Sequence, residues 1–397
     1  MEDIKRFLDL DLPQGQSCFL WGARKTGKST YLKEYFARSE QRTIYIDLLQ
    51  ADVFQRYLNH PHILREELSH ISENRIIILD EVQKVPALLD EVHSLIESHK
   101  NFQFILCGSS ARRLKTTGAN LLGGRAWRAQ FLPFCYPELK TLDFKRIFNN
   151  GLIPSHYFGE NVERSLSAYL YDYVLTEVHI EASIRKRESF SRFLDILGFS
   201  QGEMLNYTNI ARECGVDSKT VKTYFEILED MYLGYFVHPY RARPKRQIIQ
   251  ETPKFFLFDT GIASYLRRYV FKEMVGSEAG KAFEHYFFLE LMAYKHLNYI
   301  RDNITYWRTK DGKEVDFIFQ DMVFEVKISA PIQKHHLSGL LLFGKDYPEM
   351  KLNVISTEKT KRLVTYNDQK ITIWPIEKFL KALWEGLCSA GYSFSNV

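Results

Sequence analysis

The chain has 397 residues, which is enough for two to three domains that each bury a core. Its formal charge of +4 is too small to indicate nucleic-acid binding by itself, and no apolar stretch approaches the length of a transmembrane helix. Five scattered cysteines without paired spacing predict reduced thiols rather than a disulfide framework, so we expect a soluble, cytoplasmic protein without membrane contact.

The first predicted elements are a buried strand over residues 18–21 and a helix from residue 30, joined by a glycine-bearing loop. The loop reads Gly-x-x-x-x-Gly-Lys-Ser, whose backbone N–H groups can point at phosphate oxygens beside the positive end of the helix. Lys28 is expected to bridge the β- and γ-phosphates, and the Ser29 hydroxyl to ligate Mg²⁺. The alternative is a glycine-bearing turn before an ordinary helix. The predicted nucleotide-binding residues are Gly22, Ala23, Arg24, Lys25, Thr26, Gly27, Lys28, Ser29 and Thr30.

The next two predicted strands, 43–47 and 75–79, are apolar runs of the kind found in buried parallel strands. The second run ends in Asp80 and Glu81. Asp80 is expected to complete the Mg²⁺ shell of the bound nucleotide, and Glu81 to polarise the attacking water as general base. Alternatively, the two acids are solvated and open the helix that follows.

A fourth strand is predicted over residues 103–107 and runs into Ser109 and Ser110. Strands that alternate with helical stretches predict a parallel α/β sheet, in which functional groups gather at the carboxyl ends of the strands. Either hydroxyl can orient the γ-phosphate or the lytic water there. Either can instead cap the helix that begins near Ala111.

Four segments carry a family resemblance: 80–86, 108–112, 121–125 and 132–134. They look like the AAA-superfamily P-loop ATPases of bacteria and archaea, in which a C-terminal domain of uncharacterised function follows the ATPase. The resemblance implies that ATP and Mg²⁺ are the cofactors and that Ser109 is the polar sensor of the fourth strand. It also implies that Arg125 contacts the γ-phosphate, in cis or from a neighbouring subunit of a homo-oligomer. The alternative for Arg125 is a surface charge.

The middle of the chain predicts a helix-turn-helix. Residues 207–214 read as a short helix, 215–217 as a turn, and 218–228 as a second helix with Ser218 as its N-cap. Such a motif places its second helix in the major groove of DNA. The side chains expected to read DNA are Lys219, Thr220, Lys222 and Thr223.

Two β-like runs, 234–237 and 254–258, bracket a basic loop over 241–246 that contains four cations. Together they predict a hairpin wing that contacts backbone phosphates, so DNA is the expected partner of this winged helix. A solvated loop, or a packing module inside the ATPase, is the alternative. Asp259 and Gly261 are expected to form a turn rather than to act in catalysis.

The last third predicts a long helix opened by residues 280–284, then strands at 307–308, 314–318 and 324–327. A short turn at 320–321 makes the last two strands hairpin neighbours. Side chains alternate between faces along a strand, so Glu325 and Lys327 share one face and Asp316 can converge with them.

An Asp followed by Glu-x-Lys on the adjacent strand resembles the catalytic core of the restriction-endonuclease-like superfamily. The helix from residue 332 and the strands at 352–355 and 371–374 fit the same fold. The resemblance implies that Asp316 and Glu325 bind Mg²⁺ or Mn²⁺, that Glu284 adds a further metal-binding acid, and that Lys327 supports the attacking water. A structural salt-bridge network is the alternative.

The predicted fold class is therefore α/β in three parts. A P-loop NTPase domain with a parallel sheet spans 1–155, a helical linker with a winged helix spans 156–270, and a restriction-endonuclease-like domain spans 271–397. The predicted function is Mg²⁺-dependent ATP hydrolysis coupled to a nuclease-like domain that acts on DNA. The alternatives are a nucleotide switch with a non-catalytic interaction domain, and a remodelling machine that acts on protein.

Overall fold

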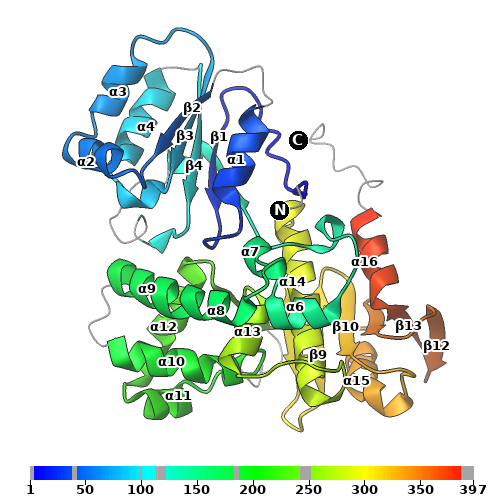
Figure 1. Cartoon of the computed structure of the whole chain (residues 1–397). Helices are drawn as coiled ribbons and strands as arrows, with labels where there is room; N and C mark the ends of the chain where they lie inside the picture. Colours follow the sequence, from blue (N-terminus) through cyan, green and yellow to red (C-terminus); the bar gives the residue numbers. More distant parts are fainter. Residues whose placement is uncertain are drawn as a thin grey trace.

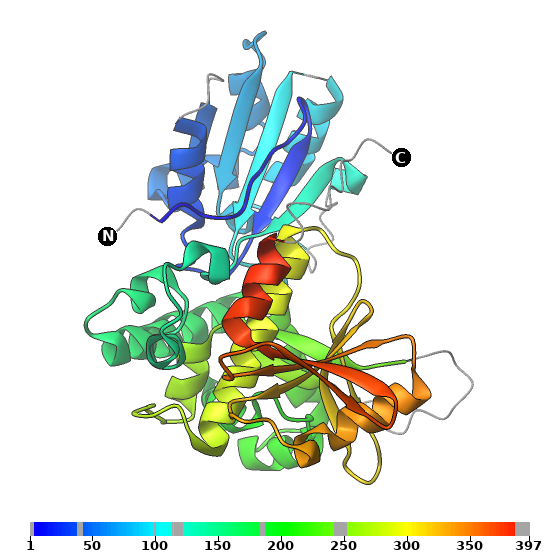
Figure 2. The same cartoon turned by 90° about the vertical axis from the view of Figure 1, so that its right-hand side faces the viewer.

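The computed structural model describes residues 4–37, 43–98, 101–112, 114, 122–182, 187–241 and 252–385. It contains a five-stranded and an eight-stranded sheet, connected along the chain by a block of helices. In Figure 1 the N-terminal sheet lies above, with the helical block and the C-terminal sheet beneath it, and Figure 2 gives the view after a quarter turn. No helix in the described part of the chain has the length and apolar character of a membrane span.

The N-terminal sheet is parallel throughout and has the order β2-β3-β4-β1-β5, which confirms the predicted parallel α/β sheet. Helix α1 packs on one face, and α3 and α4 pack on the other, so both faces are covered. Because β4 is inserted between β1 and β3, the carboxyl ends of these three strands adjoin. The elements are β1 (Ser17–Trp21), α1 (Lys28–Ala37), β2 (Thr43–Asp47), α2 (Ala51–Asn59), α3 (Ile63–Leu68), β3 (Arg75–Asp80), η1 (Val82–Lys84), α4 (Leu88–Ser98), β4 (Phe102–Gly108), η2 (Leu122–Gly124) and β5 (Ala126–Gln130).

The helical block contains the predicted pair of short helices and the hairpin that follows it. Asp217, not Ser218, caps the second helix, because its carboxylate accepts the N–H of Thr220. Asp259 has a structural role, since it caps α13 and also accepts the N–H groups of Leu152 and Ile153. The elements are η3 (Tyr136–Glu138), α6 (Phe144–Asn150), α7 (Pro154–Tyr157), α8 (Val162–Ser167), the π-helix η4 (Ala168–Val174), α9 (Leu175–Ala182), α10 (Arg187–Ser200), α11 (Tyr207–Cys214), α12 (Ser218–Asp230), β6 (Gly234–Pro239), β7 (Lys254–Leu257) and α13 (Thr260–Leu266).

The C-terminal sheet has the order β12-β13-β11-β10-β9-β8-β6-β7. Its β9–β10 pair is the predicted antiparallel hairpin. Helices α14 and α16 cover one face of the sheet and α15 covers the other. The elements are α14 (Gly276–Leu297), β8 (Thr305–Arg308), β9 (Glu314–Phe319), β10 (Met322–Lys327), η5 (Lys334–Leu337), α15 (Ser338–Asp346), β11 (Lys351–Ser356), β12 (Arg362–Tyr366), β13 (Gln369–Pro375) and α16 (Ile376–Glu385).

The hairpin β6–β7 is not a free wing. Residues His238 and Pro239 of β6 pair in parallel with Thr305 and Tyr306 of β8, so the hairpin forms one end of the eight-stranded sheet. The predicted boundary after residue 270 therefore divides two segments that share a sheet. Of the basic loop 241–246, Arg241 is described and the other residues lie outside the described residues.

Candidate functional sites

The loop between β1 and α1 wraps around the ammonium group of Lys28. Its Nζ donates hydrogen bonds to the carbonyl oxygens of Gly22, at 2.7 Å, and Ala23, at 2.8 Å. Burial lowers the pKa of Lys28, while nearby acidic groups oppose the shift. Two glycines are required here, because a Cβ on Gly22 would lie 2.1 Å from the carbonyl oxygen of Phe131 and Gly27 has a φ of +97°. The loop is thus a backbone cradle around a cation.

The other loop residues make local contacts. The Thr26 hydroxyl donates to the Ala23 carbonyl at 2.8 Å, and Lys25 lies over the ring of Tyr169 at 5.9 Å from its centroid. Thr30 is exposed on the first turn of α1.

The two predicted Mg²⁺ ligands meet at the carboxyl edge of the sheet. Ser29 Oγ donates to Asp80 Oδ2 at 2.7 Å, and the Tyr45 hydroxyl donates to the same oxygen at 2.5 Å. Asp80 Oδ1 is buried with no hydrogen-bond partner among the described residues. A hydroxyl and a carboxylate oxygen without a partner are the oxygen donors that Mg²⁺ takes beside nucleotide phosphates, so the residues fit this ion. Tyr45 was not predicted as part of the site.

Glu81 is fixed by two polar neighbours. Gln83 Nε2 donates to Glu81 Oε2 at 2.6 Å, and Ser109 Oγ donates to the same oxygen at 3.1 Å. Glu81 has a φ of 60°, which turns its side chain out of the line of β3. The Ser110 hydroxyl accepts the N–H of Arg112 at 3.2 Å and so has a local partner in the segment that follows β4. Of the two serines, Ser109 lies beside the predicted general base. Gln83 was missed, although it belongs to the segment that carried the family resemblance.

Arg24 connects the loop with the helical block. Its Nη2 lies 2.8 Å from Glu177 Oε1 of α9 and 3.7 Å from Glu81 Oε2. The guanidinium lies over the ring of Tyr173, at 5.1 Å from the centroid, and the Tyr169 hydroxyl donates to the Arg24 carbonyl at 3.2 Å. Helices η4 and α9 therefore contact the phosphate loop directly, which the sequence did not indicate.

Arg125 lies away from the loop in its own chain. It precedes β5, whose first residue Ala126 pairs with Ser17 at the amino end of β1, whereas the loop follows the carboxyl end of β1. Its side chain forms an ion pair with Glu97. The cis alternative for Arg125 is therefore not supported by its position.

A second polar cluster lies in the C-terminal sheet and contains the four predicted residues. Lys327 Nζ lies 2.6 Å from Glu325 Oε1 and 3.8 Å from Asp316 Oδ2. Asp316 Oδ2 also accepts the N–H of Val326 at 2.7 Å. Burial raises the pKa of Glu284 to about 7, and Asp316 and Lys327 are among the charges that act on it. Burial likewise raises the pKa of Glu325 well above its usual value.

Lys254 of β7 is an unexpected member of this C-terminal cluster. It is 4% exposed, lies 3.6 Å from Glu284 Oε1 through its Nζ, and forms an ion pair with Glu314. Burial acts to lower the pKa of Lys254, but Glu284, Glu314 and Asp316 outweigh it and raise that pKa. Arg308 adds another ion pair to Glu314 at 2.8 Å.

The predicted metal set Glu284, Asp316 and Glu325 is not formed as such. Within the described residues, no three His, Cys, Asp or Glu side chains are arranged to hold a metal ion. The physical reason is that the ammonium groups of Lys254 and Lys327 pair with these carboxylates. In this conformation the cluster is a network of ion pairs.

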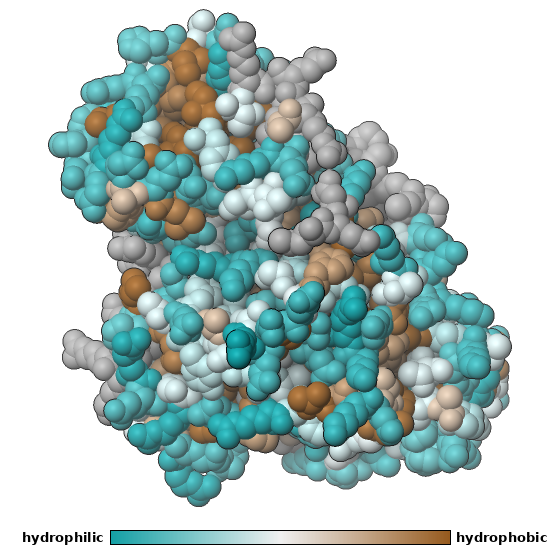
Figure 3. Space-filling model, viewed as in Figure 1, coloured by the Kyte–Doolittle hydropathy of each residue, from teal (hydrophilic) through white to brown (hydrophobic). Residues whose placement is uncertain are grey.

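The predicted helix-turn-helix corresponds to α11 and α12, and α12 carries two exposed lysines. Lys219 and Lys222 are exposed, and Lys222 lies 3.9 Å from Glu226. The Thr220 hydroxyl donates to Asp217, and the Thr223 hydroxyl donates to the carbonyl of Lys219, so both have local partners. On the face seen in Figure 3, much of the helical block is covered by hydrophilic and intermediate residues.

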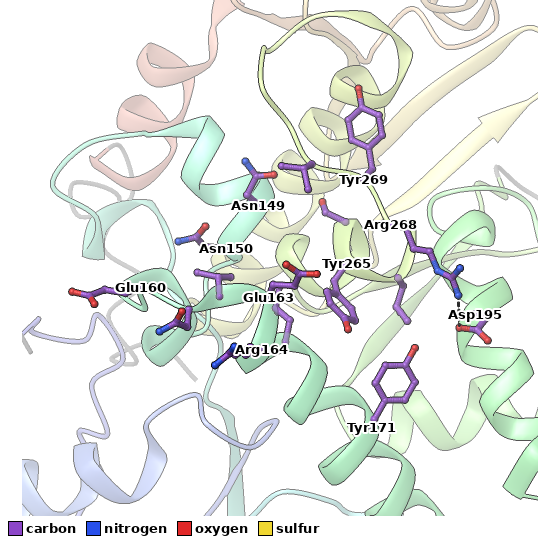
Figure 4. A pocket seen from close by; sticks show the side chains of 16 residues that line it. Asn149, Asn150, Glu160, Glu163, Arg164, Tyr171, Asp195, Tyr265, Arg268 and Tyr269 are labelled. Atoms are coloured by element: carbon purple, nitrogen blue, oxygen red, sulfur yellow. Dashed lines mark ion pairs between the residues drawn. The ribbon is translucent and has the colours of Figure 1, made fainter.

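A cavity of about 800 Å³ opens in the helical block, between α6, α8, η4, α10 and α13 (Figure 4). Polar side chains line it, and Arg268 lies 4.0 Å from Asp195 across it. None of its lining residues belongs to the phosphate loop or to the C-terminal cluster.

Three families match parts of the chain. Residues 14–140 match the family described as AAA domain, 142–272 match domain of unknown function DUF8612, and 279–379 match domain of unknown function DUF4143. No curated protein matches the chain. Solved structures that are similar include a chain from the structure of Drosophila ORC bound to AT-rich DNA and Cdc6. That chain is 10% identical, the match covers 64% of this protein and 85% of that chain, and the TM-score of 0.23 is too low to carry an argument.

The AAA domain match covers β1 to β5 together with the loop and both acids. The N-terminal unit is therefore an AAA-type P-loop domain.

Proposed function

We propose that this protein binds ATP with Mg²⁺ at the carboxyl edge of its N-terminal sheet and hydrolyses it. The observation that carries the proposal is a convergence of polar side chains from the start of α1 and from the carboxyl ends of β3 and β4: Lys28, Ser29, Asp80, Glu81 and Ser109. Phosphoryl transfer to water uses a cationic loop that binds the phosphates, a carboxylate that holds the metal and a carboxylate that activates the water. Lys28, Asp80 and Glu81 fit these three roles.

The residues divide the chemistry between them. The loop N–H groups and Lys28 bind the β- and γ-phosphates, and Ser29 and Asp80 would hold Mg²⁺, which neutralises charge on the phosphates when bound. Glu81 takes a proton from the water whose oxygen attacks the γ-phosphorus, and the bond to the β–γ bridging oxygen breaks to give ADP and phosphate. Ser109 and Gln83 orient the Glu81 carboxylate through its Oε2.

Replacing Lys28 with alanine tests this assignment. We expect ATP turnover to fall about 10²-fold or more, because the loop loses the cation that meets the developing phosphate charge. Steady-state release of phosphate, with and without single- and double-stranded DNA, is the measurement. Lys145→Ala, at an exposed lysine of α6, is the control. Turnover that survives the loss of Lys28 would overturn the ATPase assignment.

We further propose that DNA is the partner of the helix-turn-helix and the basic loop. The exposed Lys219 and Lys222 on α12 support this proposal, because a second helix with exposed cations suits a major groove. Stimulation of ATP turnover by DNA would connect this contact to the N-terminal site.

The double variant Lys219→Glu/Lys222→Glu should weaken binding of double-stranded DNA and lower its salt dependence. Loss of two cations that displace counterions from DNA reduces the slope of log affinity against log salt by about 2. Fluorescence anisotropy over a range of salt concentrations measures both effects. Lys378→Glu/Lys381→Glu is a matched control, because it has the same spacing and charge change on exposed positions of α16. An equal effect of both variants would argue against a specific role of α12.

The second candidate function is a nucleotide switch whose C-terminal unit binds a partner without cleaving it. The buried Lys254 favours this candidate, because its ammonium pairs with Glu284, a carboxylate that a nuclease would use to bind metal. Metal-dependent cleavage of DNA that is lost in Asp316→Ala would favour the nuclease instead.

A further inference from the structure

Arg24 is shared by two carboxylates that belong to different parts of the molecule. Glu81 is the proposed general base of the N-terminal unit, and Glu177 lies on α9 of the helical block. The shorter contact, 2.8 Å, is the one to Glu177. The guanidinium therefore sits at the junction between the hydrolytic site and the helices that cover it.

The Arg24–Glu177 ion pair is held in place by its neighbours and is not a solvent-exposed surface pair. The Glu177 side chain is 18% exposed, and the Tyr173 ring lies against the guanidinium. Tyr169 holds the Arg24 carbonyl from the same helical segment. These contacts fix α9 and η4 to the phosphate loop through one residue of that loop.

The position of Glu81 defines where the γ-phosphate must lie. A general base contacts the attacking water, and that water lies against the γ-phosphorus. A guanidinium nitrogen 3.7 Å from the Glu81 carboxylate is thus within reach of γ-phosphate oxygens. A phosphate offers Arg a bidentate, more highly charged partner than a single carboxylate does.

We propose that Arg24 distinguishes ATP from ADP, because the γ-phosphate competes with Glu177 for its guanidinium. This inference rests on the proposed function and deepens it. With ATP bound, Arg24 turns from Glu177 to the phosphate and loosens α9 from the loop. With ADP bound, the Arg24–Glu177 pair persists. The identity of the nucleotide is thereby passed to the helical block, which also contains α11 and α12.

The test compares the affinities of ADP and of the non-hydrolysable analogue AMP-PNP by titration calorimetry. Glu177→Gln removes the competing charge, so AMP-PNP should bind about 5-fold tighter or more while ADP affinity stays unchanged. Arg24→Gln should reduce the preference for the triphosphate to the part that Lys28 and the loop N–H groups supply. Adding Glu177→Gln to Arg24→Gln should change nothing further, because Glu177 acts through Arg24.

Glu163→Gln, at an exposed glutamate of α8, is the matched control and should leave both affinities at wild-type values. The inference fails if Glu177→Gln keeps the wild-type affinity ratio, or if it tightens both nucleotides equally. The wild type still binds AMP-PNP in those two cases, so the ATPase proposal survives them. A wild-type protein that binds neither nucleotide would instead remove the proposed function itself.

Discussion

Replacing Glu81 with glutamine is expected to lower kcat for ATP hydrolysis by about 10²- to 10⁴-fold, the usual contribution of a general base. Nucleotide affinity should change little, because Lys28 and the loop N–H groups make the phosphate contacts. Glutamine keeps the size of the side chain and can still accept from Ser109, so the fold is preserved. The amide cannot take a proton from the attacking water.

Single-turnover hydrolysis together with calorimetric ATP binding separates these two effects. Glu66→Gln, at an exposed glutamate of α3, is the control and should match the wild type in both measurements. If Glu81→Gln reduces binding as much as turnover, Glu81 holds the nucleotide or the fold. If kcat stays within 10-fold of the wild type, another group activates the water.

The central strands of the N-terminal sheet could be predicted because each is a continuous apolar run that both faces bury. The parallel strand β5 could not be predicted, because it lies at the edge of the sheet and polar side chains interrupt its apolar ones. Ala129 is its only buried residue. This omission explains why the position of Arg125 relative to the phosphate loop of its own chain could not be predicted. A residue that precedes a parallel strand lies at the amino edge, opposite the phosphate loop, but the strand had to be known first.

Apart from Ser109, which follows β4, the site residues that could be predicted lie within two short motifs. Lys28 and Ser29 follow the loop directly, and Asp80 and Glu81 end one strand, so local spacing identifies them. Tyr45 reaches Asp80 because β2 pairs with β3 in a register that puts Asp47 beside Asp80. Glu177 meets Arg24 only through tertiary packing of α9 on the loop. Neither pairing leaves a signal in the local sequence.

The C-terminal cluster shows the same limit. The order of Asp316, Glu325 and Lys327 predicted their convergence, because alternation and a hairpin turn determine it locally. Lys254 belongs to a strand that was predicted as part of a wing. The parallel pairing of β6 with β8 brings that hairpin into the sheet and places Lys254 beside Glu284. A pairing between such distant strands depends on the whole fold.

Lys254→Met is expected to lower the free energy of unfolding by about 3–5 kcal/mol, the usual effect of removing one partner of a buried ion pair. The ammonium is almost fully buried among Glu284, Glu314 and Asp316, and methionine fills its volume without its charge. The variant therefore buries Glu284 without its ion-pair partner and leaves Glu314 with Arg308 alone. Urea unfolding followed by circular dichroism measures the loss. Lys281→Met, whose lysine pairs with Glu203 at a more exposed position, should cost about 1 kcal/mol or less.

The loss of stability in Lys254→Met should also depend on pH. The direction of this dependence shows whether the loss arises from the missing counter-ion. Burial already raises the pKa of Glu284 to about 7 from its ordinary 4.5, and removing the ammonium raises that pKa further. The folded variant then binds protons that the unfolded chain has released, so its stability rises as the pH falls from above 7 towards 4.5. The difference in free energy of unfolding between the variant and the wild type should therefore narrow over that interval. Adding Glu284→Gln to Lys254→Met should recover part of the lost stability at pH 8. A deficit that is equal at pH 5 and pH 8 would show that Lys254 stabilises the sheet by packing and not as the counter-ion of these carboxylates.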